Sequence, residues 1–122
     1  MMIFAFFFFT DGGCKNTIHS TFFSPDQKHK IVLHNYDCGA TTGFSTHISL
    51  IESDEMIDGA GNTFVADDDH GKARSHPSFD TLIDVNIEWL DNRTVKITYD
   101  KLARVFEEDE RVDGIDIKYV RK

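Results

Sequence analysis

Hydrophobic and polar residues alternate with a period of two over two neighbouring stretches in the second half of the chain. Over residues 82–90 the apolar positions are Ile83, Val85, Ile87 and Trp89. After a turn at residues 91–93 the alternation resumes at Val95, Ile97 and Tyr99. Successive side chains of a strand point to opposite faces, so this pattern predicts a half-buried β-hairpin.

Shorter segments elsewhere show the same period. We expect strands at residues 30–36, 44–51, 62–66 and 115–119. In the second of these, the apolar face carries Phe44, Ile48 and Leu50, and the polar face carries Ser45, His47 and Ser49. The spacing of the apolar residues in 102–106 is compatible with either one turn of helix or an irregular strand.

Three connecting segments have their own signals. Residues 15–23 read as a polar lead, and residues 24–28, Ser-Pro-Asp-Gln-Lys, predict a type I turn with proline at its second position. Residues 67–80 are polar without any period, which predicts a long surface loop.

These strands and connections define the expected fold class. We predict an all-β or β-dominated α+β domain with at most one short helix, whose antiparallel sheet forms a sandwich, a small barrel or a meander. The chain has 122 residues and 40% hydrophobic content, enough to bury one core without obligatory metals or several disulfides. One domain over residues 14–122 is therefore expected.

Residues 1–13 differ in character from the rest. Met1 to Phe9 is apolar and uncharged, too short to cross a hydrocarbon core of about 30 Å and similar in length to the core of a signal peptide. Gly12, Gly13 and Cys14 resemble the end of a bacterial lipoprotein signal peptide, whose cysteine is acylated. We expect a cell-envelope protein, with membrane contact only through a lipid anchor at Cys14. The alternative is an apolar first strand in a cytoplasmic protein.

The chain has two cysteines, Cys14 and Cys38, and two states are open for them. If Cys14 carries lipid, Cys38 is a lone thiol of the buried, apolar kind. If the pair is oxidised, it closes a loop of about 25 residues and stabilises the fold by roughly 3 kcal/mol. No CxxC-type spacing supports a structural zinc site.

The net charge is −8, from 21 acidic and 13 basic residues. This excess argues against nucleic acid and anionic membrane surfaces as partners, and it allows a basic protein partner or a cation. No cofactor is expected. The densest acidic set is typical of a solubilising surface or of an immunity-type inhibitor of a basic toxin or enzyme; it comprises Glu107, Glu108, Asp109, Glu110, Asp113 and Asp116.

The stretch from Tyr36 to Ile51 carries most of the candidate chemistry. Its loop, residues 39–43, has glycine at both ends, and neighbouring polar side chains are able to cap the loop amides. The same amides would suit an anion. The ligand-binding candidates are therefore Asp37, Thr41, Thr42, Ser45 and His47. The alternative is a turn whose polar side chains serve only its own backbone.

Two other clusters suggest chemistry. Cys38, with His47 or His34 as its base, would make a small hydrolase if the strands bring Cys38 opposite His47, although a reactive thiol needs an electropositive setting and Asp37 is adjacent. The second cluster supplies ligand atoms for calcium or zinc but lacks the ligand order of an EF-hand loop; it comprises Asp67, Asp68, Asp69 and His70, with His76 nearby. A solvated acidic loop is the alternative.

Residues 24–51, SPDQKHKIVLHNYDCGATTGFSTHISLI, resemble a family of small uncharacterised bacterial proteins, many of them predicted lipoproteins. That family shares an SPD-x-K turn and a DCGATT-x-FST segment, followed by a Gly-Asn-x-Phe segment and a strand centred on tryptophan. Residues 61–64 and Trp89 match the last two, and Gln27 departs from the pattern because relatives tend to have glycine there. The resemblance implies an envelope location and a β-rich fold rather than a reaction.

These features predict a small exported or lipid-anchored envelope protein that acts by binding rather than by catalysis. The alternatives are an immunity-type inhibitor, a small Cys/His hydrolase, and a structural module whose 39–43 loop only sets the strand register.

Overall fold

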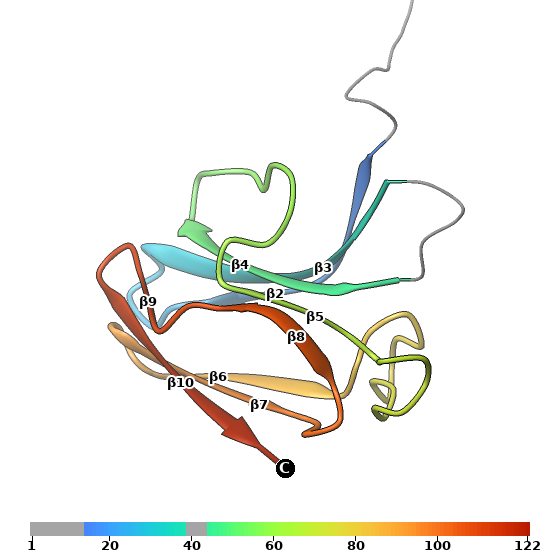
Figure 1. Ribbon diagram of the computed structural model, residues 1–122. Coiled ribbons are helices and arrows are strands. Elements are labelled where there is room, and N and C mark those ends of the chain that lie inside the picture. The colour runs from blue at the N-terminus through green and yellow to red at the C-terminus, as the bar shows by residue number, and fades with distance from the viewer. Residues whose placement is uncertain (1–13, 39–43) are drawn as a thin grey trace, which may run out of the picture.

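The computed structural model describes residues 14–38 and 44–122. Within these residues the protein is all-β, with two sheets and no helix (Figure 1). The predicted β-dominated fold is confirmed, as two sheets rather than a closed barrel. The predictions for residues 1–13, and for Thr41 and Thr42, lie outside the described residues. Over residues 14–38 and 44–122, no helix is long and apolar enough to cross a membrane.

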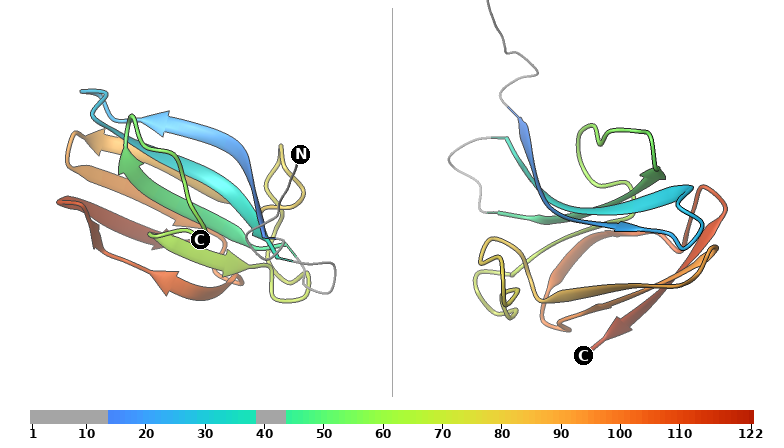
Figure 2. Two further views of the ribbon diagram at one scale, coloured as in Figure 1. Left: turned by 90° about the horizontal axis from the view of Figure 1, so that it is seen from above. Right: turned by 180° about the vertical axis from the view of Figure 1, so that it is seen from behind.

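The larger sheet has five strands in the order β2-β3-β4-β5-β8, and all its neighbours are antiparallel. Its strands are β2 (Lys15–Phe23), β3 (His29–Asp37), β4 (Thr46–Glu52), β5 (Phe64–Asp67) and β8 (Arg104–Glu108). The smaller sheet has four strands in the order β6-β7-β10-β9. They are β6 (Val85–Asp91), β7 (Thr94–Tyr99), β10 (Ile115–Arg121) and β9 (Arg111–Val112). The two sheets lie face to face as two layers (Figure 2).

Within the smaller sheet, β7 and β10 run parallel. After β7 the chain crosses to the edge of the larger sheet as β8 and then returns, so β10 enters beside β7 in the same direction. The pairs Ile117–Val95 and Tyr119–Ile97 place apolar side chains together on the inner face. The alternation of residues 115–119 correctly predicted a strand, but the crossover decides its partner.

The hydrophobic core lies between the inner faces of the two sheets. Phe64 of β5 and Tyr99 of β7 are its largest fully buried side chains, and their ring centroids are 4.9 Å apart. Tyr119 of β10 stacks on Phe64 at 6.0 Å. These three aromatic rings therefore join the two layers, because Phe64 belongs to the larger sheet and Tyr99 and Tyr119 to the smaller one.

The predicted β-hairpin is confirmed as β6 and β7. Its inner positions Val85, Ile87, Val95 and Ile97 are buried, whereas Asn86 and Glu88 are exposed. The prediction for Phe44 was wrong: this residue precedes β4, and 56% of it is exposed. Phe44 therefore adds nothing to the core face of β4.

Residues 15–23, read from the sequence as a polar lead, form the edge strand β2. They pair with β3 from Lys15 opposite Asp37 to Phe23 opposite Lys30, with a bulge between Ile18 and Ser20. The bulge and the open edge leave most side chains of β2 half-buried or exposed, which explains why no period marked this strand.

The two remaining ambiguous segments are resolved. Residues 104–108 are the strand β8 rather than a helical turn, paired with β5 across a bulge between Val65 and Ala66. The polar interval after β5 is the predicted loop, but it is not loose. Ala73 is buried, and an isolated bridge joins Ser75 to Ile83. This loop therefore has a defined position beside β4.

The start of β2 and the end of β3 are joined by a disulfide between Cys14 and Cys38. Because Lys15 lies opposite Asp37, the antiparallel register brings the next residue on each strand together. Of the two states open to the cysteines, the structure has the oxidised pair, in which Cys14 has no thiol left for a lipid. The cross-link closes a loop with a sequence separation of 24 residues.

The double variant Cys14→Ala/Cys38→Ala is expected to lower the free energy of unfolding by about 3 kcal/mol, because the unfolded chain regains the freedom that the cross-link removes. Urea denaturation measures the loss, and the reduced wild-type protein should show the same midpoint as the variant. Equal midpoints for the oxidised wild type and the variant would contradict the disulfide.

The predicted turn at residues 24–28 is present between β2 and β3. The Gln27 amide donates to the Ser24 carbonyl at 2.9 Å, and the Ser24 hydroxyl donates to the Asp26 carboxylate at 2.7 Å. Gln27 has φ of 64°, the left-handed conformation that glycine usually supplies directly after a type I turn in a hairpin. The backbone at this position therefore suits glycine better than glutamine.

Gln27→Gly is expected to raise the free energy of unfolding by about 1 kcal/mol, since glycine adopts a positive φ without the steric cost of a Cβ atom. Thermal and urea denaturation measure the gain. Gln27→Ala is the matched control, which removes the same side chain but keeps the Cβ and should bring no gain. If alanine stabilises as much as glycine, the backbone conformation is not the cause.

Candidate functional site

The polar residues of β3 and β4 point to opposite sides of the larger sheet. The register pairs His34 with His47 and Asn35 with Thr46. Neighbouring side chains on a strand alternate between faces, so the two histidines lie on the outer face, whereas Asn35 and Thr46 lie on the inner one. The outer and inner groups therefore have different surroundings.

On the outer face His34 and His47 are both buried, at 0% and 4% exposure. The nitrogens of His34 bond to the Asn16 side-chain oxygen at 2.7 Å and to the Ser49 hydroxyl at 2.9 Å. Those of His47 bond to the Ser45 hydroxyl at 2.7 Å and to the Gly61 amide at 2.9 Å. The two ring centroids are 5.5 Å apart.

This network corrects the interpretation of β4 as a half-buried strand with an exposed polar face. The face that carries His47 and Ser49 is buried as fully as the face that carries Ile48 and Leu50. Burial lowers the pKa of both His34 and His47 to about 4. Both rings are therefore neutral near pH 7 and serve as structural hydrogen-bonding groups.

The pairing expected for a Cys/His hydrolase is not formed. His34, not Cys38, lies opposite His47, and Cys38 is bonded to Cys14. A nucleophilic thiolate and a hydrogen-bonded base are both needed for that chemistry. Neither is present at Cys38 in this oxidised state.

On the inner face, polar side chains fasten residues 81–83 to β3 and β4. Asn35 donates to the Thr81 carbonyl at 3.1 Å and accepts from the Thr81 hydroxyl at 2.8 Å. The Thr46 hydroxyl accepts from the Ile83 amide at 2.9 Å. These bonds hold one wall of a cavity in place.

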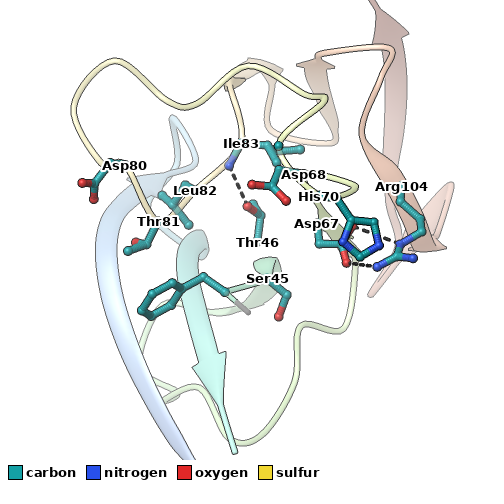
Figure 3. A pocket seen from close by; sticks show the side chains of 12 residues that line it. Ser45, Thr46, Asp67, Asp68, His70, Asp80, Thr81, Leu82, Ile83 and Arg104 are labelled. Atoms are coloured by element: carbon teal, nitrogen blue, oxygen red, sulfur yellow. Dashed lines mark hydrogen bonds and ion pairs between the residues drawn. The ribbon is translucent and has the colours of Figure 1, made fainter. Parts of the chain in front are cut away.

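The cavity has a volume of about 670 Å³ and lies where β4 begins and β5 ends (Figure 3). Its walls come from the start of β4, the loop after β5, the segment before β6 and the first residue of β8. The lining residues are Phe44, Ser45, Thr46, Asp67, Asp68, His70, Gly71, Asp80, Thr81, Leu82, Ile83 and Arg104. Volumes of this size are typical of small-molecule and side-chain binding pockets.

Arg104 and Asp67 form a bidentate ion pair at one side of this pocket. The register of β5 and β8 places them directly opposite each other, and the guanidinium donates to both carboxylate oxygens, at 3.1 and 2.6 Å. Burial raises the pKa of Asp67, but the bonds from Arg104 and from the Asp69 amide outweigh it, so the pKa is lowered. The Arg104 charge is therefore matched within the protein.

Asp68 and Asp80 are different, since neither carboxylate makes a hydrogen bond or an ion pair with any residue in 14–38 and 44–122. Figure 3 shows Asp68 beside Thr46, and Asp80 on the side of the pocket away from Arg104. With one guanidinium against three carboxylates, the pocket has an excess of negative charge.

The structure divides the other sequence candidates. Ser45 lines the pocket, and Asp37 is exposed at the end of β3. His47 is buried on the outer face, where the Gly61 amide bonds to it. Of the metal candidates, Asp67, Asp68 and His70 line the pocket, and Asp67 is bound there by Arg104, whereas Asp69 pairs with Lys72 at 3.5 Å. Within the described ranges no three such side chains are arranged to hold a metal ion.

Three members of the acidic set near the C-terminus are paired with other side chains of the protein. Glu108 accepts from the Tyr99 hydroxyl at 2.5 Å, Asp113 pairs with His29 at 3.1 Å, and Asp116 pairs with Arg111 at 2.6 Å. Burial, followed by the charge of Asp109, raises the pKa of Glu107. These side chains therefore serve the fold as well as the surface.

Sequence reasoning missed Asp80, Thr81 and Arg104 as pocket residues. They come from segments that lie far apart in the chain and meet only through the pairing of β5 with β8 and the bonds from Asn35. No local pattern marks them. The one available signal was the opposite charge of Asp67 and Arg104, which is informative only once the register is known.

Thr46→Val is expected to lower the free energy of unfolding by about 1 to 3 kcal/mol, because the buried Ile83 amide loses its acceptor. Thr46→Ser keeps the hydroxyl and should retain most of that stability. Urea denaturation of the two variants decides the point. A loss in the serine variant with none in the valine variant would mean that the methyl group, not the hydrogen bond, matters.

Comparisons with protein-family models, with curated proteins and with solved structures found no match to this chain. The similarity of residues 24–51 to small bacterial lipoproteins therefore stays a prediction, and the geometry of the pocket carries the functional argument.

Proposed function

We propose that this protein is an exported binding protein whose acidic pocket accepts a positively charged group, such as a lysine or arginine side chain of a basic partner. The observation that supports this most directly is the pair Asp68 and Asp80. Both carboxylates border the pocket, and neither has a partner among the described residues. The charge of Arg104 attracts Asp68, but the guanidinium donates its hydrogen bonds to Asp67 and bonds directly to neither Asp68 nor Asp80.

The dimensions and walls of the pocket suit such a group. A volume of about 670 Å³ is ample for one long side chain and its nearest water. The hydroxyls of Ser45 and Thr81 offer further acceptors, and the apolar wall at Leu82 suits an aliphatic stem. A cation entering this pocket gains attraction without displacing an internal ion pair.

Binding rather than catalysis agrees with how the reactive side chains are used. Cys38 is held in a disulfide, and His34 and His47 are buried with all ring nitrogens bonded. The groups most often used as nucleophile and base thus serve the fold.

Export agrees with the disulfide and with the apolar residues 1–13. Disulfides persist mainly in oxidising compartments such as the bacterial periplasm, and an apolar N-terminal run followed by small residues is typical of a signal sequence. Because Cys14 is in the disulfide, the proposal is a protein released into the envelope rather than one anchored by lipid on that residue.

An immunity-type inhibitor of a basic toxin or enzyme is a specific form of this proposal. The acidic segment from Glu107 to Glu110 begins at the far end of β8, the strand whose first residue, Arg104, lines the pocket, so it adds negative charge on the same strand. Such a surface accelerates and orients association with a basic protein.

The proposal predicts that the pocket binds a charged side chain and rejects a neutral side chain of the same shape. Calorimetric titration with an acetyl-Gly-Arg-Gly-amide peptide should show binding that weakens with added salt, whereas the citrulline analogue, a neutral isostere, should not bind measurably. Asp68→Asn should weaken binding of the arginine peptide about tenfold, equivalent to about 1.4 kcal/mol.

Asp54→Asn is the matched control, because Asp54 is an exposed carboxylate beyond the other end of β4 and should leave the affinity unchanged. Equal binding of the arginine and citrulline peptides, no binding of either, or equal effects of the two substitutions would each refute the proposed function.

A further inference from the structure

Residues 53–61, here called the strap, follow β4 and fold back over the outer face of the larger sheet (Figures 1 and 2). Their far end is fastened at residues 62 and 63. The Asn62 side chain bonds to both backbone groups of Leu50, at 2.8 and 2.9 Å, and the Thr63 amide donates to the Ile48 carbonyl at 3.0 Å. None of these groups titrates between pH 4 and pH 7.

The strap itself is held over the sheet by side chains on the buried polar face. Asn16 of β2 donates to the Gly59 carbonyl at 3.0 Å, and the Gly61 amide donates to Nδ1 of His47 at 2.9 Å. Gly61 approaches β4 so closely that an added Cβ would lie 2.8 Å from the Ile48 carbonyl oxygen. The strap therefore sits directly on the histidine network.

These contacts define where each histidine carries its proton. Because Asn16 donates its NH₂ group to Gly59, its oxygen accepts from Nδ1–H of His34, and Nε2 of His34 accepts from the Ser49 hydroxyl. Nδ1 of His47 accepts from Gly61, so the proton of His47 is on Nε2 and is donated to Ser45. Every ring nitrogen is satisfied in the neutral form.

A second proton would disrupt this arrangement. On His47 the second proton would occupy Nδ1 and point at the Gly61 amide hydrogen, so two donors would face each other. If both rings were protonated, two positive charges would lie in a buried site with ring centroids 5.5 Å apart. Removing the strap would allow water to solvate the charged rings.

Within residues 14–38 and 44–122, no acidic side chain contributes a compensating negative charge to either ring. From β2, the charge of His19 opposes protonation of His34, and from β3, the uncharged Tyr36 packs edge-on against His47 at 5.8 Å. The acidic side chains of the strap, Asp54, Glu55 and Asp58, are exposed to solvent.

We propose that mildly acidic solution releases the strap from the outer face of β3 and β4 while the sandwich stays folded. A fall in pH then exposes a second, polar surface of the protein. The hinge is at Asn62, whose bonds to Leu50 do not depend on pH. The inference does not rest on the ligand proposed for the pocket, although Ser45 both lines the pocket and bonds to His47.

The sign of the effect follows from the two states. With the strap closed, burial lowers the pKa of His34 and of His47 to about 4, from an ordinary value of 6.5. The open state therefore binds more protons between these two values, and the fraction open grows as pH falls through that window. The opening equilibrium constant rises by up to about tenfold per pH unit for each histidine released.

Amide hydrogen exchange followed by NMR tests the proposal on the wild-type protein. Between pH 6.5 and pH 4.5 the protection factor of the Gly61 amide, corrected for intrinsic exchange, should fall by up to about tenfold per unit for each histidine released. The Ile97 amide, in β7 of the smaller sheet, should keep its protection. Constant protection at Gly61, or a parallel fall at Ile97 that reports global unfolding, would overturn the proposal.

His47→Asn provides the variant test, since the asparagine oxygen can take the place of Nδ1 as an acceptor for Gly61 and cannot be charged. It should reduce the pH dependence of Gly61 protection by up to about tenfold per unit, the share of one histidine. His76→Asn is the matched control, because Nδ1 of His76 likewise accepts a backbone amide, from Ser78 at 3.0 Å, outside this network. An unchanged pH profile in His47→Asn would contradict the assigned role, and if that variant does not fold, the wild-type profile decides.

Discussion

The two central strands β3 and β4 are covered on both faces, and the rest of the molecule is arranged around that constraint. On the inner side Ile31, Leu33, Ile48 and Leu50 pack into the core between the sheets. On the outer side, among residues 14–38 and 44–122, the loop that follows β4 lies over the sheet. A loop of this length has too little apolar surface to make a second core, so the outer face is closed mainly by hydrogen bonds. Every polar group there must have a partner, because water is excluded.

The histidine network satisfies this requirement for the polar groups of the outer face. No buried side-chain nitrogen or oxygen among the described residues lacks a partner, and the two imidazoles achieve this by using one nitrogen as donor and the other as acceptor. The same two strands present Asn35 and Thr46 on the inner side, where they hold the wall of the acidic pocket. The disulfide fixes the start of β2, two residues before Asn16. The pocket wall and the network are thus anchored on β3 and β4, and the cross-link joins β3 to its other neighbour, β2.

The parts of this arrangement that depend on local alternation were predictable from the sequence. The β6–β7 hairpin and the strand β10 follow from a period of two, because each presents one face to the core and one to water. The turn at residues 24–27 follows from Ser-Pro-Asp. The edge strand β2 did not follow, since a bulge and an open edge erase its period, and neither did the parallel partner of β10, which depends on a crossover through the other sheet.

The candidate site was predictable only in part, for a physical reason. Alternation shows that His47 faces away from Ile48, but it does not show whether a loop covers that face. Ser45, Asp68 and His70 were marked by their composition. Arg104, Asp80 and Thr81 meet them only through contacts between distant segments, which have no local signature. The stretch from Tyr36 to Ile51 thus owes its polar character mainly to the buried network and to the pocket wall.

The central claim is that His34 and His47 are neutral structural groups with opposite tautomers. Long-range ¹H–¹⁵N NMR spectra of the imidazole rings at pH 6 test it directly, because the nitrogen shifts separate protonated, unprotonated and charged states. The account predicts a proton on Nδ1 alone for His34 and on Nε2 alone for His47. A charged imidazolium on either ring, or shifts averaged between tautomers as in a solvent-exposed histidine, would contradict it.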